Sequence, residues 1–263
     1  MNILEIEQLS IGTYSRGKFR KLVTNLGLAV QQGEILGLAG SNGAGKSLTA
    51  SAVSGALPSG VQIISGSIKL CGNKLKPGKK KDWNGKRGVQ ILPIFQSASQ
   101  ALNPTLRVKT QLTESLRNIK GLSRKESINR AIQLVHNVGL EKEHLSAYPF
   151  ELSGGMRQRI LIALAYGLKP NLVVADEPTT GLDPVTQKRI LDLMLRLRDK
   201  HESSFLFISH DLQAVCYMAD KIAIMSSQGI VESQTPLELW KRPQTYIGRS
   251  MVQAFGTLLE KET

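Results

Sequence analysis

Cysteines and long hydrophobic runs are scarce in this sequence of 263 residues. The two cysteines, Cys71 and Cys216, lie far apart and outside any Cys-x-x-Cys pattern, which argues against a disulfide framework or a zinc site and favours a reducing compartment. The longest apolar run, Ile160–Leu168, is well short of the roughly 20 residues that cross a bilayer and is typical of a helix core. The first residues, Met1–Ile6, lack the basic and then apolar pattern of a secretory signal. We therefore expect a chain that neither spans a membrane nor is secreted.

Acidic residues are in the minority, with 21 Asp and Glu against 34 Lys and Arg, for a formal net charge of +13. Such an excess is compatible with nucleic acid, anionic lipid or an acidic partner. Much of it lies in residues 74–87, which contain one aromatic residue, Trp83, and the basic residues Lys74, Lys76, Lys79, Lys80, Lys81, Lys86 and Arg87. A solvated loop is the simpler interpretation. A loop near anionic lipid headgroups is the alternative, since each basic residue there is worth about 1 kcal/mol.

Hydrophobic patterning alternates between strand and helix, as in an α/β domain with a mainly parallel sheet. Residues 4–10 and 26–30 alternate apolar and polar positions, which predicts antiparallel strands with one solvated face. Residues 110–144 lack strand signals and carry helical spacing, so we expect a small helical lobe there. The other predicted elements are strands at 34–39, 63–71, 88–94, 172–175, 204–208 and 221–225, and helices at 46–55 and 185–201.

A glycine-rich segment follows the predicted strand 34–39 and matches the P-loop pattern G-x-x-x-x-G-K-S. Its glycines allow backbone N–H groups to turn toward the β- and γ-phosphates of a nucleotide, Lys46 supplies a positive charge, and the Ser47 hydroxyl ligates Mg²⁺. We expect ATP to contact Gly40, Ser41, Asn42, Gly43, Ala44, Gly45, Lys46, Ser47 and Leu48.

Two adjacent acidic residues, Asp176 and Glu177, follow the apolar strand 172–175, at the carboxyl end where α/β sheets bind ligands. Asp176 is predicted to hold Mg²⁺, and Glu177 to polarise the water that attacks the γ-phosphate. Two acids that merely cap a buried strand are the alternative, but a P-loop in the same chain favours catalysis.

The segment Leu152–Arg159, with the sequence Leu-Ser-Gly-Gly-Met-Arg-Gln-Arg, resembles the signature loop of ATP-binding-cassette (ABC) ATPases. The resemblance implies one ABC ATPase domain over residues 1–263, in which a P-loop NTPase core with a mainly parallel sheet carries an antiparallel β lobe, a helical lobe near 97–170 and a C-terminal extension at 236–263. It also implies that ATP is sandwiched between two subunits. The backbone N–H groups of Gly154 and Gly155 and the Ser153 hydroxyl cannot reach the ATP of their own P-loop. They are therefore expected to contact ATP held by the partner's P-loop.

The same resemblance assigns roles to residues that mean little in isolation. Gln96 matches the Q-loop glutamine that approaches Mg²⁺ and the attacking water, and His210 matches the switch histidine that senses the γ-phosphate near Glu177. Thr180–Asp183 is similar to the D-loop, which contacts the opposite subunit. Tyr14 is the expected adenine-stacking residue, with Phe19 as its competitor. The predicted catalytic residues are Glu177, His210 and Gln96, the metal ligands are Ser47, Gln96 and Asp176, and further nucleotide contacts come from Tyr14, Ser153, Gly154, Gly155 and Asp183.

Three stretches, Phe95–Pro104, Tyr148–Arg159 and Ala175–Thr180, resemble the peptide/nickel importer ATPases, and this resemblance covers nearly the whole chain. Gly55–Val61 and Phe150 are closer to the nickel subunit, so we expect ATP and Mg²⁺ to drive import of nickel or a related transition metal, free or as a chelate. Import of dipeptides or oligopeptides is the runner-up. A non-transport ABC ATPase and an exporter half are further alternatives.

Two departures from the family pattern bear on this prediction. Ser97–Ala98 replace the acidic or amide residue and proline that usually follow the Q-loop glutamine, which puts the coupling to the permease in question. The segment after Tyr246 lacks the cysteines of many oligopeptide-type subunits, so no iron–sulfur cluster is expected.

The expected partners follow from the importer resemblance. They are a second ABC ATPase subunit, either a copy or a paralogue, two membrane permease subunits and, indirectly, an extracytoplasmic solute-binding protein; no nucleic acid is expected. The resemblance places the chain peripherally on the cytoplasmic face of the inner membrane.

Overall fold

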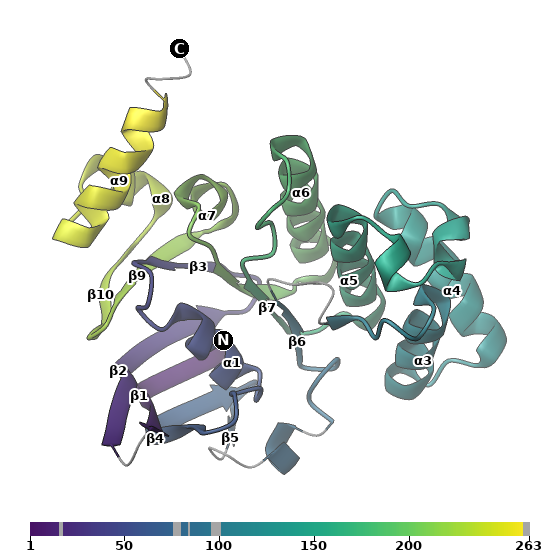
Figure 1. Ribbon diagram of the computed structural model, residues 1–263, viewed down its shortest axis with the longest axis horizontal. Helices are drawn as coiled ribbons and strands as arrows, with labels where there is room; N and C mark the ends of the chain where they lie inside the picture. The colour runs from purple at the N-terminus through teal and green to yellow at the C-terminus, as the bar shows by residue number, and fades with distance from the viewer. Residues whose placement is uncertain (16–17, 76–79, 84, 96–100, 260–263) are drawn as a thin grey trace.

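A six-stranded sheet forms the centre of the computed structural model, which describes residues 1–15, 18–75, 80–83, 85–95 and 101–259 (Figure 1). Its strand order is β10-β9-β3-β8-β7-β6, and every neighbouring pair is parallel except the β9–β10 pair at one edge. The strands are β3 (Ile35–Gly40), β6 (Ile91–Ile94), β7 (Leu172–Asp176), β8 (Ser204–Ile208), β9 (Lys221–Ser226) and β10 (Gly229–Gln234). The carboxyl ends of three adjacent parallel strands, β3, β8 and β7, therefore lie next to one another, and we call this end of the sheet its carboxyl edge.

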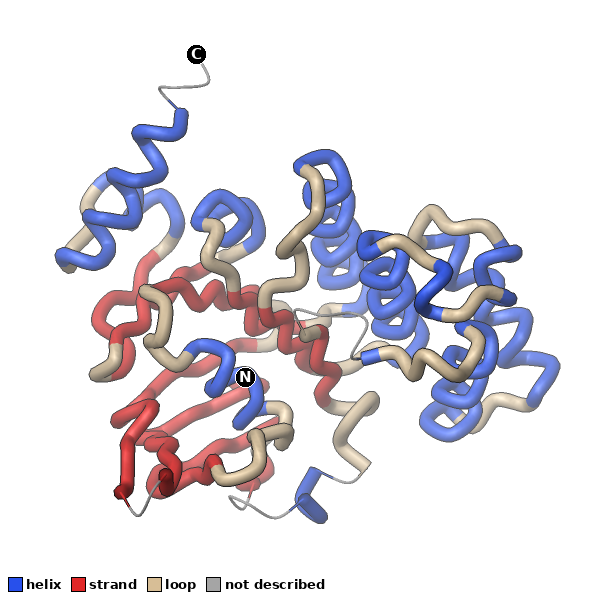
Figure 2. The backbone as a smooth tube through the Cα atoms, in the orientation of Figure 1, coloured by secondary structure: helices blue, strands red, loops and turns tan. Residues whose placement is uncertain are grey.

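A second, four-stranded antiparallel sheet has the order β2-β1-β4-β5. Its strands are β1 (Asn2–Ser15), β2 (Lys18–Gln31), β4 (Val61–Leu70) and β5 (Asn73–Leu75). The helix α1 (Lys46–Val53) packs into the same hydrophobic core as this sheet. In Figure 2 the antiparallel strands form a layer of their own beside the central sheet.

Helices cover the face of the central sheet that lies opposite α1 and the antiparallel sheet. Some of them form a helical lobe, which is drawn at the right of Figures 1 and 2. The lobe contains α3 (Val108–Lys120), α4 (Arg124–Asn137), two short 3₁₀ turns at Lys142–Ser146 and Pro149–Glu151, and α5 (Gly154–Leu168). The remaining α-helices are α6 (Pro184–His201), α7 (Leu212–Met218), α8 (Pro236–Lys241) and α9 (Tyr246–Leu259). A capping box between Ser123 and Glu126 fixes the start of α4.

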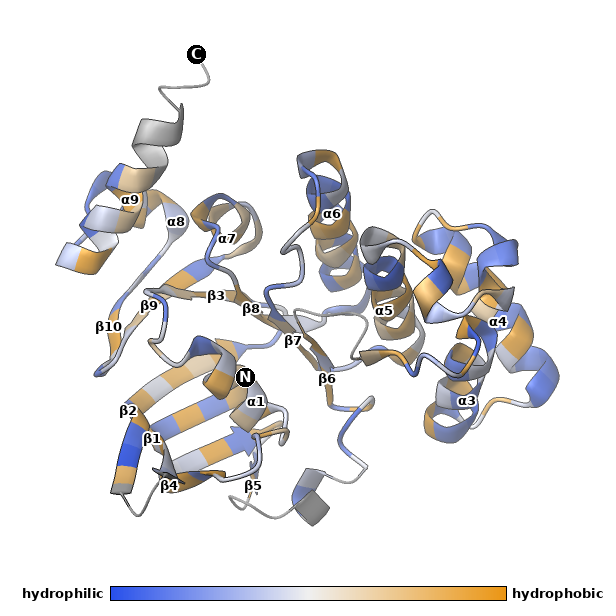
Figure 3. Cartoon of the chain, in the orientation of Figure 1, coloured by the Kyte–Doolittle hydropathy of each residue, from blue (hydrophilic) through white to orange (hydrophobic). Residues whose placement is uncertain are grey.

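The central sheet separates two hydrophobic cores because its side chains alternate between its faces. In β8, Phe205 and Phe207 belong to the core shared with α3–α6, whereas Leu206 and Ile208 belong to the core shared with α1 and the antiparallel sheet. All five residues of β8 are buried, and so are all five of β7. Figure 3 shows these central strands in hydrophobic colours between more polar outer helices.

The predicted α/β class, with a mainly parallel core sheet, an antiparallel sheet and helices, is confirmed. Some boundaries were wrong. The strand expected from residue 88 begins only at Ile91, because residues 87–90 form a turn in which the Lys86 carbonyl accepts from the Gln90 and Ile91 N–H groups. The helix expected to reach residue 55 ends at Val53, just before Gly55 turns the chain with φ of 65°. The pattern did not predict β5, β10 or α7–α9.

Candidate nucleotide-binding site

The P-loop connects the end of β3 to the start of α1, at the carboxyl edge of the parallel sheet. Two of its glycines have backbone angles that other residues rarely adopt: φ is 148° at Gly40, whose α-carbon lies against the backbone of Met225, and 103° at Gly45. Gly45 is the N-cap of α1, and no side chain caps this helix end. The N–H groups of the first turn are therefore available to phosphate oxygens, at the positive end of the helix dipole.

Lys46 is held inside the loop, with only 7% of its surface exposed. Its Nζ donates to the carbonyl oxygens of Gly40 at 2.8 Å and Ser41 at 3.1 Å, so the ammonium lies within the turn of the P-loop. Burial lowers the pKa of Lys46, while the negative charges of Glu177 and Asp176 oppose that effect. A positive charge that is buried and only partly compensated is well placed to attract phosphate.

Ser47 and Asp176 bring two oxygen atoms together from α1 and the end of β7. The Ser47 hydroxyl donates to Asp176 Oδ1 over 3.2 Å, and Asp176 is 6% exposed. Burial raises the pKa of Asp176, the charge of Glu177 adds to the rise, and the hydrogen bond from Ser47 and the charge of Lys46 oppose it. A hydroxyl and a carboxylate are the oxygen ligands that Mg²⁺ accepts alongside water and phosphate, so this pair fits the ion.

Glu177 lies at the next position with an unusual backbone, since its φ of 50° is rare for a residue other than glycine. Its N–H donates to the Ile208 carbonyl at 2.8 Å, which ties the end of β7 to the end of β8. The carboxylate oxygen Oε2 accepts from the Thr180 hydroxyl at 2.8 Å and lies 3.0 Å from Nδ1 of His210. Backbone strain of this kind costs energy and is typical of functional sites.

The predicted neighbours Glu177 and His210 are thus brought together, and His210 lies two residues beyond the end of β8. Sequence reasoning missed the support behind His210. Asp211 caps the start of α7 by accepting from the N–H groups of Gln213 and Ala214, and its second oxygen accepts from the Gln187 amide of α6 at 2.7 Å. The capping role of Asp211 could have been predicted, because an Asp that precedes an apolar helix is a common N-cap. Nothing in the sequence indicates that Gln187 donates to Asp211.

The signature segment is built on α5 and faces α6 instead of the P-loop. Ser153 is the N-cap of α5 and accepts from the Met156 N–H, and Asp183 caps α6 in the same way. A Cβ on Gly155 would approach the Thr186 methyl to 2.6 Å, so this glycine allows α5 and α6 to pack closely. Across the described part of the chain, no hydrogen bond joins Ser153, Gly154 or Gly155 to the P-loop.

Tyr14 and Phe19 form a tilted aromatic pair at the tips of β1 and β2, with ring centroids 5.1 Å apart. Tyr14 is 67% exposed and Phe19 is 40% exposed, so both rings are available for stacking. Gln96 and the Ser97–Ala98 pair lie outside the described residues.

The basic segment 74–87 is described only in part, and Lys76 and Lys79 lie outside that part. Trp83 is not a surface platform, because it is 6% exposed and its ring lies against Gly55. Arg87 donates to the Ser54 and Gly55 carbonyls at the end of α1, which is a structural role.

Within the described residues, no helix is long and apolar enough to cross a membrane. The same residues contain no group of three or more His, Cys, Asp or Glu side chains arranged to hold a metal ion.

Comparison with known proteins identifies a family for this chain. The ABC transporter family model matches residues 23–180. The chain is 35% identical to the dipeptide transport ATP-binding protein DppD of Lactococcus lactis, over 92% of this chain and 70% of that protein. It is 36% identical to the probable D,D-dipeptide transport ATP-binding protein DdpD of Escherichia coli, over 92% and 75%.

Solved structures share the fold. The ATP-binding cassette MJ0796, in a dimeric post-hydrolysis state bound to ADP and Pi, superposes with a TM-score of 0.79 at 21% identity and covers 89% of this chain and 98% of its own. The protein cbiO1 of Clostridium perfringens, part of the ABC transporter complex cbiONQ, has a TM-score of 0.76 at 24% identity, over 98% and 99% of the two chains.

Proposed function

This chain belongs to the ABC transporter family, and from that premise we propose that it is the ATP-hydrolysing subunit of an importer for dipeptides or oligopeptides. The observation that carries the catalytic part is the position of Glu177. Thr180 and His210 hold its carboxylate, which follows Asp176 of the Ser47–Asp176 pair, at the sheet edge where the P-loop begins.

Each side chain at this edge has a step to perform. The P-loop N–H groups and Lys46 bind the phosphates, and Ser47 and Asp176 would hold Mg²⁺, which neutralises phosphate charge when bound. Glu177 orients the attacking water and accepts its proton, while His210 contacts the γ-phosphate side of the site. Tyr14, or Phe19 beside it, stacks on the adenine.

The site is completed by a second subunit, a copy or a paralogue. Ser153 is exposed and Gly154 half-buried, whereas Gly155 is buried. The Ser153 hydroxyl and the backbone N–H groups of the two glycines serve the ATP of the opposite P-loop. Asp183 and the loop before α6 contact the same partner. Because γ-phosphate then bridges two subunits, hydrolysis releases them, and membrane permease subunits on which they dock convert that motion into transport.

The names of the relatives favour peptides over nickel as the solute. DppD and DdpD are dipeptide transport proteins, and oligopeptide transport proteins OppD from Lactococcus lactis and Bacillus subtilis are 36% identical to this chain. Nickel import stays a prediction, supported by the resemblance of Gly55–Val61 and Phe150 to the nickel subunit. A solute-binding protein outside the membrane would select the solute in either case.

Reconstitution tests the whole proposal. The subunit is placed in proteoliposomes with its permease and solute-binding protein, and ATP turnover is measured with dipeptide, oligopeptide, nickel or nickel chelate. We expect stimulation by peptides, because a loaded binding protein favours closure of the ATPase pair. Stimulation by nickel alone would make nickel the transported solute and would leave the assignment as an ATPase intact. No turnover in any arm would contradict the catalytic assignment.

A further inference from the structure

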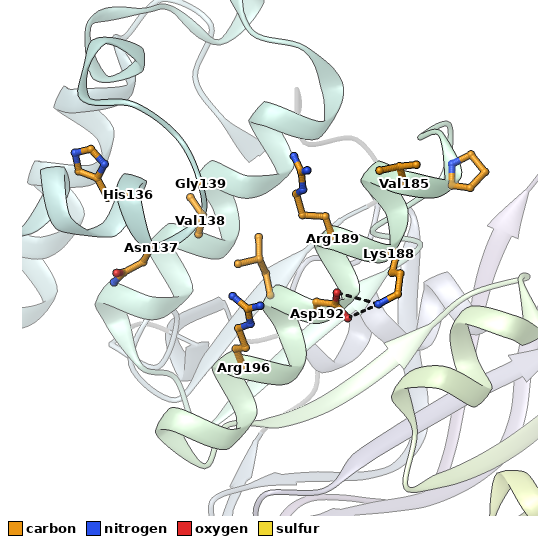
Figure 4. A pocket seen from close by; sticks show the side chains of 11 residues that line it. His136, Asn137, Val138, Gly139, Val185, Lys188, Arg189, Asp192 and Arg196 are labelled. Atoms are coloured by element: carbon orange, nitrogen blue, oxygen red, sulfur yellow. Dashed lines mark hydrogen bonds and ion pairs between the residues drawn. The ribbon is translucent and has the colours of Figure 1, made fainter.

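A second cleft lies between the end of α4 and the outer face of α6, and it shares no residue with the P-loop, Asp176, Glu177 or His210 (Figure 4). Its volume is about 680 Å³, within the range of small-molecule sites. The α4 side contributes residues 136–139, and the α6 side contributes Pro184, Val185, Lys188, Arg189, Asp192, Leu193 and Arg196.

Positive charge converges on this cleft without matching negative charge. Lys188, Arg189 and Arg196 line it against a single carboxylate, that of Asp192. Asp192 is already engaged, because Lys188 Nζ lies 3.2 Å away and the Tyr217 hydroxyl donates to it at 2.6 Å. Among the residues that the structure describes, Arg189 and Arg196 have neither an ion-pair nor a hydrogen-bond partner.

A further arginine supports the α4 wall from behind. Arg159 of α5 donates to the Gly139 carbonyl at 2.7 Å, which neutralises the negative end of α4 at the cleft. Burial lowers the pKa of Arg159, and the positive charge of Arg189 lowers it further. The two guanidinium groups therefore repel each other, and an anion between the walls would relieve that repulsion.

The floor of the cleft is apolar. Val138 and Leu193 are buried at 1% and 5% exposure, and Pro184 and Val185 extend the apolar surface toward the start of α6. Arg189 and Arg196 are seven residues apart, which puts them two turns apart on one face of the helix. In Figure 4 both extend from α6 beside this floor, on the side of Val138 and Asn137.

We propose that this cleft is a second anion-binding site, which takes a phosphorylated small molecule of nucleotide size. The two arginines bind phosphoryl oxygens, for which the guanidinium fork is the best-suited side chain, and the apolar floor takes a base or another flat group. The bound molecule bridges the helical lobe and α6, which begins immediately after Asp183. It therefore connects the lobe that carries the signature segment to the core.

Calorimetric titration of the full chain tests this site after one equivalent of MgADP has been added for the P-loop, so that no excess nucleotide competes for the cleft. The probes are inorganic tripolyphosphate, guanosine diphosphate and decaglutamate, each with excess Mg²⁺. We expect saturable binding of one guanosine diphosphate per chain, several-fold tighter than tripolyphosphate because of the apolar floor. Binding of tripolyphosphate as tightly as guanosine diphosphate would overturn the assignment of the floor. Tighter binding of decaglutamate than of either phosphate would overturn the proposal and assign the cleft to an acidic protein segment.

The variant Arg189→Ala/Arg196→Ala should weaken guanosine diphosphate binding at least tenfold, and raising the salt concentration should weaken it in the wild type. Both substitutions lie in a helix, where alanine is favourable, and circular dichroism checks the fold. The matched control Arg124→Ala/Lys125→Ala removes the same charge from the far end of α4 and should bind as the wild type does. If both double variants lose guanosine diphosphate binding equally, or if neither loses any, the cleft is not the binding site for this molecule.

Discussion

The carboxyl edge of the central sheet and the start of α5 are built in opposite ways. At the sheet edge, side chains from α1, from the end of β7 and from the loop after β8 contact one another. Ser47 contacts Asp176, and His210 contacts Glu177. At the start of α5, Ser153 bonds only to its own helix, and Gly155 packs on Thr186. One region is a connected network within the chain. The other leaves Ser153 exposed, with no hydrogen bond to the P-loop among the described residues, as a site shared between subunits requires.

The strongest test of the connected region is Glu177→Gln. The amide cannot accept a proton, so ATP turnover should fall by about 10²–10⁴-fold, the usual contribution of a general base. ATP binding should persist, because Glu177 is not among the groups that hold the phosphates. Turnover is measured by phosphate release, and association with MgATP by light scattering.

Lys46→Ala serves as the contrast, since it should weaken nucleotide binding itself. A stable MgATP-dependent dimer of the Glu177→Gln protein would agree with a shared site. Turnover near that of the wild type would remove Glu177 from the catalytic role.

Ser153→Arg probes the outward-facing region. The bulky side chain should leave ATP binding by the chain's own P-loop intact but reduce turnover in the partner's site by about 10²–10³-fold, the scale of removing a transition-state donor. Mixing this variant with Lys46→Ala protein concentrates both defects in one site of a mixed dimer and leaves the other intact. Recovery of turnover on mixing is expected. No recovery would argue that Ser153 acts within its own chain.

How much of this contrast was predictable depends on how local its causes are. The P-loop and the two acids at the end of β7 were visible because each is a short segment with a fixed chemistry. The packing of Gly155 on Thr186 and the bond from Gln187 to Asp211 join residues distant in sequence, and no local pattern encodes them. The strand β10 was missed for a similar reason, since it is an edge strand with a mixed pattern that depends on β9.

Gly155→Ala sharpens the contrast by separating packing from phosphate binding. The new methyl would meet the Thr186 methyl at 2.6 Å, so the free energy of unfolding should fall by about 1–3 kcal/mol, as for other overpacked sites. Thr186→Ser removes the clashing methyl and should restore stability in the double variant. Urea denaturation of all four proteins measures this coupling. An equal loss in the single and double variants would mean that the α5–α6 contact is not the cause.

Gln187→Leu tests the support behind His210 at a smaller scale. Loss of the amide leaves one Asp211 oxygen without its donor, which costs about 0.5–1.5 kcal/mol and should lower turnover by about 2–10-fold. ATP affinity should stay the same, since Gln187 is remote from the P-loop. A change in ATP affinity alone would point to a different role.

The smallest effect concerns what Asp176 contributes to the stability of the folded protein. Burial and the charge of Glu177 raise its pKa above the ordinary 3.8, so the folded protein binds the proton more tightly than the unfolded chain does. The stability that this group contributes is complete below pH 3.8 and is lost as the pH rises through the raised pKa. At pH 7 the ionised carboxylate therefore destabilises the nucleotide-free fold. Asp176→Asn should raise the melting temperature there by about 2 °C, with a smaller gain at pH 5.

MgATP should reverse this order, because a ligand stabilises only a protein that binds it, and Asp176→Asn is expected to lose the metal. Differential scanning fluorimetry at pH 5, 6, 7 and 8, with and without MgATP, measures both parts. A nucleotide-free Asp176→Asn protein that melts below the wild type at every pH would mean that Ser47 and Lys46 stabilise the carboxylate more than burial penalises it. The sheet edge would then be organised by its own charges before any nucleotide binds, which would widen the contrast with the start of α5.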